Sequence, residues 1–338
     1  MKRYLTVVLL IMLMVVPTIA QDEVAIGVTP EVIAQYPEPN IRPLVVDPNL
    51  IYDRAYRRVE GNLAMYDAGG NLVNDMGEGY NYVTLSGAMT QGDWTQIAPD
   101  RWVPTSNLSE DVAISRYAGV RLPEEGLPYT MAWTLRHLNP SETPGGEQSD
   151  NNPFLYRYTR VSIYATVQVE GYDWYQVGEN QWIHQFNVAK IVPIERPADV
   201  NTDKWISVDL YEQVLIAYED DIPVFATLIA SGLPEWSTNE GTFNVYLRRE
   251  RTTMSGAYNR PDFYYLEEVP WTMFFDGDIA LHGTFWHDKF GYRQSHGCVN
   301  MSITDANWIY EWSSDVRDFS VEDSPDLSVH VYSSGEYS

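Results

Sequence analysis

The chain has 338 residues, of which 44% are hydrophobic and 20% charged, so it can bury a sizeable core and is not a disordered protein. Its formal charge of −25 excludes a nucleic-acid binder, because no basic face could offset repulsion by phosphate, and disfavours docking on anionic lipid. The 24 tyrosines and 11 tryptophans, with frequent glycine and proline, favour a mainly β fold.

The first 20 residues have the pattern of a secretory signal peptide. Two basic residues precede an apolar run at residues 5–16, and small residues precede Gln21. We therefore expect an exported protein of the cell wall or the extracytoplasmic face. An uncleaved anchor is the alternative, and signal or anchor is the only membrane contact that we expect. The proline-rich residues 21–49 are predicted to form an extended linker.

An internal repeat follows the linker. Residues 93–108 (DWTQIAPDRWVPTSNL) align without a gap with residues 173–188 (DWYQVGENQWIHQFNV). Each copy is typical of a β-hairpin, with a four-residue turn between two Trp-bearing strands. The motif resembles bacterial SH3-like modules, small β-barrels of cell-wall proteins. We predict a first SH3-like module at 50–138, an exposed loop at 139–153 and a second module at 154–200, with a plain β spacer that binds no ligand as the alternative.

A change in composition at Glu195–Asp203 predicts that the last domain covers residues 204–334. One helix is expected near its end, capped by Ser302, with Asp305 completing a capping box. Apolar runs predict six strands before the helix, at residues 205–210, 214–218, 224–229, 243–247, 271–275 and 279–282.

The single cysteine, Cys298, lies close in sequence to His282 and His296. One cysteine cannot form an internal disulfide, so it is a passive buried thiol, an intermolecular partner or a nucleophile. A strand, a loop and a second strand can bring His282 to Cys298, where the imidazole can take the thiol proton and return it to a leaving group. Gly297 allows close approach of substrate and can expose N–H groups to an oxyanion.

The segment Ser295-His296-Gly297-Cys298-Val299-Asn300, with His282-Gly283-Thr284 upstream, resembles the signature of the L,D-transpeptidases, the YkuD catalytic domain. Residues 205–232 are similar to the family's opening strands. TNEGTF at 238–243 is similar to its T-P-x-G-x-F turn, with Asn239 where proline is usual. The resemblance covers about residues 204–334. It implies a mainly β chain: tandem SH3-like small β-barrels, then a YkuD-type β-sandwich with one or more short helices.

The resemblance also implies roles for individual residues. Cys298 is the nucleophile, His282 accepts and donates the proton, and the backbone of Gly283 orients that histidine. The oxyanion and acyl pocket is expected to be lined by Ser295, His296 and Gly297.

Four further residues near the cysteine have less defined roles. The resemblance suggests Trp286 as a wall of the substrate pocket. Asn300 stands where many relatives carry arginine, so the contacts of that arginine are in doubt here. By its chemistry, Arg293 is a candidate for binding a substrate carboxylate, with a solvated loop arginine as the alternative. His287 matches no family role and is predicted to lie on the surface.

The implied reaction is peptidoglycan L,D-transpeptidation in cell-wall biogenesis, with a role in cell shape. Cys298 attacks a stem tetrapeptide before its terminal D-Ala, and the thioester passes to an amine, giving a 3→3 cross-link or an anchored protein. Stem peptides are the implied partners, carbapenem β-lactams the implied covalent inhibitors, and no cofactor is required. Because the proposed catalytic residues lie between 282 and 300, we expect small peptides to react without residues 21–200.

Three alternatives use the same residues. One is an L,D-carboxypeptidase or hydrolase, in which water resolves the thioester. Another is a non-catalytic protein that binds the cell wall. The last is a zinc site that uses His282, His287, His296 and Cys298, although their spacing fits no common zinc motif.

Overall fold

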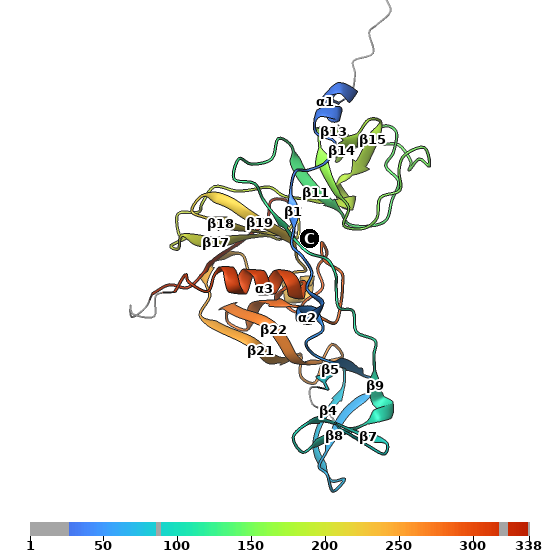
Figure 1. The fold of residues 1–338 in the computed structure, drawn as a ribbon, viewed down its shortest axis with the longest axis vertical. Helices are drawn as coiled ribbons and strands as arrows, with labels where there is room; N and C mark the ends of the chain where they lie inside the picture. The colour runs from blue at the N-terminus through green and yellow to red at the C-terminus, as the bar shows by residue number, and fades with distance from the viewer. Residues whose placement is uncertain (1–26, 86–88, 318–323, 337–338) are drawn as a thin grey trace, which may run out of the picture.

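The computed structural model describes residues 27–85, 89–317 and 324–336, which form mainly β-strands in several sheets (Figure 1). The mainly β prediction is therefore confirmed. The predicted signal peptide at residues 1–20 lies outside the described residues. Within the described residues, no helix is both long and apolar enough to cross a bilayer.

The elements fall into three groups along the chain. The first contains α1 (Pro30–Gln35), β1 (Arg42–Pro43), α2 (Pro48–Ile51), β2 (Tyr56–Val59), β3 (Asn62–Tyr66), β4 (Leu72–Glu78), β5 (Tyr80–Thr84), β6 (Thr90–Gln91), β7 (Trp94–Ala98), β8 (Arg101–Pro104), the 3-10 helix η1 (Thr105–Asn107) and β9 (Leu108–Ser109). The second contains β10 (Val120–Arg121), β11 (Thr130–Thr134), β12 (Arg160–Ile163), β13 (Ala165–Val169), β14 (Tyr172–Gly178), β15 (Gln181–His184), η2 (Gln185–Asn187) and β16 (Val188–Lys190). The third contains β17 (Lys204–Asp209), β18 (Val214–Glu219), β19 (Ile222–Leu228), η3 (Pro234–Trp236), β20 (Gly241–Asn244), β21 (Leu247–Gly256), β22 (Tyr264–Asp276), β23 (Ile279–Gly283), β24 (Val299–Met301), α3 (Ile303–Trp312) and β25 (Ser328–Tyr332).

The C-terminal domain is a sandwich of two sheets. One sheet has the order β1-β10-β19-β18-β17-β25-β20, and the other β24-β23-β22-β5-β2-β9, with β21 beside β22. A core of aliphatic and aromatic side chains from both sheets includes Ile206, Phe225 and Leu281, each with 0% exposure. Helix α3 lies between the two sheets in Figure 1 and buries Ala306 and Ile309 in this core. The removal of these apolar side chains from water is the main favourable contribution to the folding of such a domain.

Four of the six predicted strands of this domain correspond to β17, β18, β19 and β23. The expectation of one strand at 243–247 is wrong, because the chain changes sheets there. β20 pairs with β25, whereas β21 pairs with β22, and Val245 between them is buried in the core. The apolar run at 271–275 is the second half of the longer strand β22.

The cap of α3 agrees with the prediction in one half only. The Ser302 hydroxyl accepts a hydrogen bond from the N–H of Asp305, as expected. The hydrogen bonds of the Asp305 carboxylate run mainly to other segments, although the Ser302 side chain also acts on it and lowers its pKa. The carboxylate accepts from the N–H of Gly119 at 2.8 Å and from Thr227 Oγ1 at 2.7 Å. Burial raises the pKa of Asp305 to about 6, so its carboxylate depends on these donors.

Both predicted hairpins are confirmed. β7 and β8 turn between Ala98 and Arg101, β14 and β15 turn between Gly178 and Gln181, and a 3-10 helix follows each second strand. The second tryptophan of each copy, Trp102 or Trp182, is a buried core residue.

The described strands around these hairpins form open sheets, of order β4-β3-β8-β7-β6 and β13-β14-β15, not closed barrels. The expectation of barrels is therefore not met, and the SH3-like likeness of the repeats stays a prediction. The structure also gives a reason: β2, β5 and β9, which neighbour the first hairpin in sequence, pair into the C-terminal sheet instead.

The segments before the last domain are part of its architecture. We call β2 to β9, residues 56–109, the first module, and β11 to β16, residues 130–190, the second module. They lie at opposite ends of the C-terminal sheets (Figure 1). The predicted linker at 21–49 is not extended throughout, because it contains the helix α1 and the start of α2, and its strand β1 pairs with β10. The prediction of one module at 50–138 is wrong, because these residues belong to different sheets. β10 pairs into a C-terminal sheet, and β11 pairs with strands of the second module.

The first module and the C-terminal domain share one core. β5 runs parallel to β22, and the Tyr56 ring stacks on Phe285 with 3.6 Å between centroids. Arg54 Nε donates to Glu268 at 2.7 Å. The expectation that the last domain works without residues 21–200 is therefore revised, because its hydrophobic surface is completed by earlier segments.

Candidate active site

Two parallel strands bring the predicted catalytic residues together. His282 on β23 lies opposite Asn300 on β24, and Cys298 immediately precedes β24. Side chains alternate along a strand, so Cys298 and Asn300 point to one face. Cys298, His282 and Asn300 line one cavity of about 720 Å³. His282 and Cys298 thus line the same cavity.

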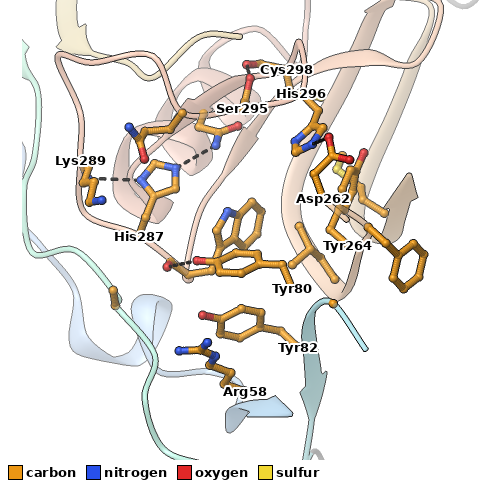
Figure 2. A pocket seen from close by; sticks show the side chains of 18 of the residues that line it. Arg58, Tyr80, Tyr82, Asp262, Tyr264, His287, Lys289, Ser295, His296 and Cys298 are labelled. Carbon is orange, nitrogen blue, oxygen red and sulfur yellow. Dashed lines mark hydrogen bonds and ion pairs between the residues drawn. The ribbon is translucent and has the colours of Figure 1, made fainter. Parts of the chain in front are cut away.

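The cavity has walls from two parts of the chain (Figure 2). From the C-terminal domain come, among others, His282, Trp286, His287, Ser295, His296, Cys298 and Asn300. The opposite wall is formed by the first module and the segment that follows it, including Arg58, Tyr80, Tyr82 and Asp111. Trp286 therefore lies where the sequence placed it, whereas the second wall was not predicted.

Cys298 is half-buried and lies immediately before β24. Its Sγ donates to the carbonyl of Asp278 at 3.7 Å. Burial raises the pKa of the thiol to about 11, although a backbone hydrogen bond from Ala280 acts in the opposite direction. The resting nucleophile is therefore the protonated thiol, which needs a base before it can attack.

His282 has the properties of that base. It is 2% exposed, and its Nδ1 lies 3.1 Å from the carbonyl oxygen of Gly283. The carbonyl can only accept, so Nδ1 carries the proton and Nε2 has the lone pair. Burial lowers the pKa of His282 to about 4, which keeps the ring neutral at neutral pH. The Gly283 backbone thus orients the ring in the way that the resemblance implied.

The turn before Cys298 is held by hydroxyl groups. Ser295 Oγ donates to the carbonyl of Cys298 at 2.5 Å and accepts from the N–H of Gly297 at 3.1 Å. Thr238 Oγ1 donates to the Gly297 carbonyl at 2.7 Å. Gly297 has φ +116°, a conformation that suits glycine. Ser295 lines the cavity as predicted, but Gly297 does not, and its N–H is already donated to Ser295.

His296 has a carboxylate partner that the sequence did not reveal. Its Nε2 lies 3.1 Å from Oδ2 of Asp262, and Trp236 Nε1 donates to the same oxygen at 2.9 Å. The Tyr264 ring lies 5.0 Å from the His296 ring. Figure 2 shows Asp262 and Tyr264 beside His296 at the cavity wall. Asp262 lies in the loop between β21 and β22, so only the fold brings it here.

The prediction that His287 lies on the surface is wrong. It is 9% exposed, lines the cavity and accepts at Nδ1 from the N–H of Lys289 at 3.2 Å. The side-chain amide of Asn300 lies 2.9 Å from its Nε2. The atom at this distance is the amide nitrogen Nδ2, so the buried side chains of His287 and Asn300 are in direct contact. Burial is the main cause that lowers the pKa of His287 to about 3.

Arg293 does not reach the cavity of Cys298. Its Nε donates to the Gly232 carbonyl at 2.7 Å, and it lines a separate cavity of about 730 Å³ with Arg157 and Tyr292. The prediction that Arg293 binds a substrate carboxylate beside the cysteine is therefore not supported by its place. The N–H groups of Gly291 and Gln294 donate to the carbonyls of Ile229 and Ser231, which fixes the backbone on both sides of Arg293.

The four residues of the zinc alternative all line the Cys298 cavity. Among the described residues, however, no three histidine, cysteine or acidic side chains are grouped as metal ligands would be. The structure therefore gives the zinc alternative no support.

Replacing His287 with alanine should destabilise the fold. The change leaves the buried Asn300 amide without its partner and opens a void, which together should lower the free energy of unfolding by about 2–4 kcal/mol. Urea denaturation of both proteins measures this. The matched control is His137→Ala, because His137 is exposed. Equal midpoints for the two variants would contradict a packing role for His287.

The comparisons with known proteins agree on residues near the C-terminus. Residues 203–322 match the model of the YkuD family, the L,D-transpeptidase catalytic domain. YciB of Bacillus subtilis (strain 168), whose name assigns it provisionally to the L,D-transpeptidases, is 29% identical over 120 residues, covering 32% of this chain and 59% of that protein. The chain thus spans less than two thirds of this curated relative.

Solved structures of similar sequence include an L,D-transpeptidase C442S mutant from Enterococcus faecium. It is 26% identical, covers 38% of this chain and 50% of its own, and has a TM-score of 0.32. The catalytic domain of the E. faecium L,D-transpeptidase is 27% identical over 39% of this chain and 98% of its own, with a TM-score of 0.31. From the family match, residues 203–322 of this chain are a YkuD domain, the catalytic domain of L,D-transpeptidases.

Proposed function

We propose that the protein is an exported peptidoglycan L,D-transpeptidase with Cys298 as nucleophile. One observation carries the proposal: within a domain of this family, the single cysteine of the chain shares a cavity with a buried, neutral and oriented histidine. A non-catalytic wall-binding protein has no need for such a pair. Export and a place in the cell wall rest on the N-terminal pattern of the sequence.

The reaction follows from these two residues. Nε2 of His282 takes the thiol proton as Sγ of Cys298 attacks the carbonyl carbon before the terminal D-Ala of a stem tetrapeptide. The carbon–nitrogen bond breaks, the proton passes to the leaving amine, and a thioester remains on Cys298. The amine of a second stem, or of a wall-anchored protein, then attacks the thioester carbon and releases the thiol. Water in place of the amine gives the hydrolase alternative.

The oxyanion of each step needs N–H donors beside Cys298. The N–H of Gly297 is committed to Ser295 Oγ at 3.1 Å, so it can serve the oxyanion only when that hydrogen bond opens. Ser295 therefore determines, through this hydrogen bond, whether the Gly297 N–H is available to the oxyanion. We assign Ser295 a positioning role on this ground, and not a direct contact with the oxyanion.

His282→Ala should slow formation of the acyl-enzyme by about two to four orders of magnitude, which is the usual contribution of a positioned acid–base group. The thiol, with its pKa raised to about 11, has no other oriented base in the proposal. Stopped-flow or quenched measurement of D-Ala release from a tetrapeptide tests this. An acylation rate within fivefold of the wild type would remove His282 from the mechanism.

The pH dependence of kcat/KM should reflect a neutral thiol–imidazole pair. Above its pKa of about 4, His282 is neutral and can accept the proton, and below about 11 the thiol is protonated. We expect a plateau from pH 6 to 9 and half of the plateau value near pH 4, with circular dichroism to confirm folding. An acid limb centred near 6.5 would instead indicate a histidine with an ordinary pKa.

Defined muropeptides test the function. The mature protein is incubated with a disaccharide-tetrapeptide donor and an amine acceptor, and the products are identified by mass. A dimer with loss of D-Ala supports transpeptidation, and a tripeptide alone supports the hydrolase alternative. The proposal also predicts a covalent carbapenem adduct. Absence of both products and of the adduct would contradict an enzymatic function and favour a wall-binding protein.

A further inference from the structure

The wall of the cavity opposite Cys298 belongs to segments outside the matched catalytic domain. Arg58 on β2 and Tyr80 and Tyr82 on β5 line it, all far in sequence from residues 203–322. Figure 2 shows Tyr80 and Tyr82 between His287 above and Arg58 below, at the end of the view opposite Cys298. The family match therefore assigns these residues no role.

This wall is built rigidly onto the catalytic domain. Tyr80 pairs with Tyr264 in the parallel β5–β22 register, and its N–H donates to the Phe263 carbonyl at 2.9 Å. A Cβ on Gly79 would lie 2.6 Å from the same carbonyl oxygen, so the approach requires glycine there. The Tyr80 hydroxyl donates to the Trp286 carbonyl at 2.8 Å. The wall is thus preformed, which lowers the entropy lost on binding.

The chemistry of the wall suits a peptide with a carboxylate. The Tyr80 side chain is 39% exposed and offers an aromatic face, supported by Tyr82 with 5.0 Å between ring centroids. The Arg58 side chain is 38% exposed, and its Nη1 donates to Asp111 at 3.2 Å. Its Nε lies 3.6 Å from Oε1 of Glu60, so Nη2 is the guanidinium nitrogen for which the described residues supply no hydrogen bond. A guanidinium has five N–H donors, so Arg58 can hold a substrate carboxylate beside Glu60 and Asp111.

We propose that Tyr80 and Arg58 form a subsite for a peptidoglycan stem peptide, with the peptide against the Tyr80 ring and a stem carboxylate on Arg58. The inference rests on the proposed function, because the cavity is then the place where stems meet Cys298. Donor and acceptor stems carry the same chemistry, so the experiment has an arm for each. The first module is a part of the substrate site and not only a spacer.

The test uses the full-length mature protein with Arg58→Glu and Tyr80→Ala. The matched control is Arg101→Gln, because Arg101 is a cation of the same module on β8 and does not line the cavity. The donor arm measures kcat/KM for D-Ala release from a tetrapeptide. The acceptor arm measures the ratio of transfer to hydrolysis at fixed acceptor. Acylation of Cys298 by a carbapenem, followed by intact mass, reports the catalytic residues alone.

We expect Arg58→Glu to lower one of the two stem readouts about tenfold, which corresponds to the loss of about 1.4 kcal/mol of binding. Tyr80→Ala should lower the same readout at least fivefold, and carbapenem acylation should stay within twofold of the wild type. If Tyr80→Ala does not fold, Arg58→Glu alone keeps the test, and Tyr80→Phe becomes a control because it keeps the aromatic ring and removes only the bond to Trp286.

Four outcomes are decisive. A loss in the donor arm makes this the donor subsite, and a loss in the acceptor arm makes it the acceptor subsite. Both arms within twofold of Arg101→Gln overturn the inference while leaving the proposed function intact. A wild-type protein that forms neither carbapenem adduct nor D-Ala contradicts the proposed function itself, and the inference with it.

Discussion

Cys298→Ala should abolish both transfer and hydrolysis while the protein stays folded. Cys298 is the only thiol of the chain and takes part in no disulfide, so its loss removes the nucleophile without removing a cross-link. A half-buried side chain truncated by one atom should change the free energy of unfolding by less than about 1 kcal/mol. Circular dichroism and the muropeptide assay measure the two parts of this prediction.

Cys298→Ser is the matched control for Cys298→Ala, because it keeps the shape of the site. A serine hydroxyl is far harder to deprotonate than a thiol, so this variant should also be inactive in a site built around a neutral imidazole. Turnover close to the wild type in the alanine variant would show that another residue forms the covalent bond.

Deleting residues 27–200 should destroy both the fold and the activity of the remaining domain. The deletion exposes Phe285, on which Tyr56 stacks, and leaves Asp305 without the Gly119 N–H. It also removes the strands β10 and β5 that pair with the C-terminal sheets. Each lost contact is worth about 1–4 kcal/mol, against a total stability of about 5–15 kcal/mol for a domain.

A single substitution gives a graded version of the deletion. Tyr56→Ala should lower the free energy of unfolding by about 3–5 kcal/mol, since a buried aromatic ring is lost. Tyr52→Ala is the control, because Tyr52 is 54% exposed and close by in sequence. Thermal unfolding of the purified proteins compares them. A cooperative, active fragment of residues 201–338 would contradict the shared core.

The sequence located the central pair of the site because the signal there is local. His282 ends an apolar strand, His296 and Cys298 flank a glycine, and these short motifs need no knowledge of the fold. The two hairpins were found for a similar reason, since a repeat with matched tryptophans and turn residues specifies a strand pair by itself. The capping role of Ser302 is local as well.

Residues that reach the site through packing could not be found in this way. Asp262, Tyr80 and Arg58 come from a loop and strands whose position depends on the β5–β22 pairing, for which no short motif exists. His287 was placed on the surface because it matches no role in the family signature. Its burial follows from contacts with Asn300, 13 residues later.

Two errors had a common physical origin. Arg293 was given its role as a carboxylate binder from its chemistry alone, and Asp305 its role as half of a capping box from its spacing to Ser302. In the structure, each is bound to backbone groups of another segment, Gly232 and Gly119 respectively. A charged side chain that becomes buried takes whichever partners the fold brings to it, and these partners are distant in sequence.

The most direct test of the account is to trap the covalent intermediate on the wild-type protein. The protein is mixed with a tetrapeptide donor without acceptor, quenched in acid, and analysed by intact mass and peptide mapping. The account predicts the mass of the donor less D-Ala on the peptide that contains Cys298, absent from Cys298→Ala and slow to form in His282→Ala. Product formation with the adduct on another residue, or with no adduct and full activity in Cys298→Ala, would contradict it.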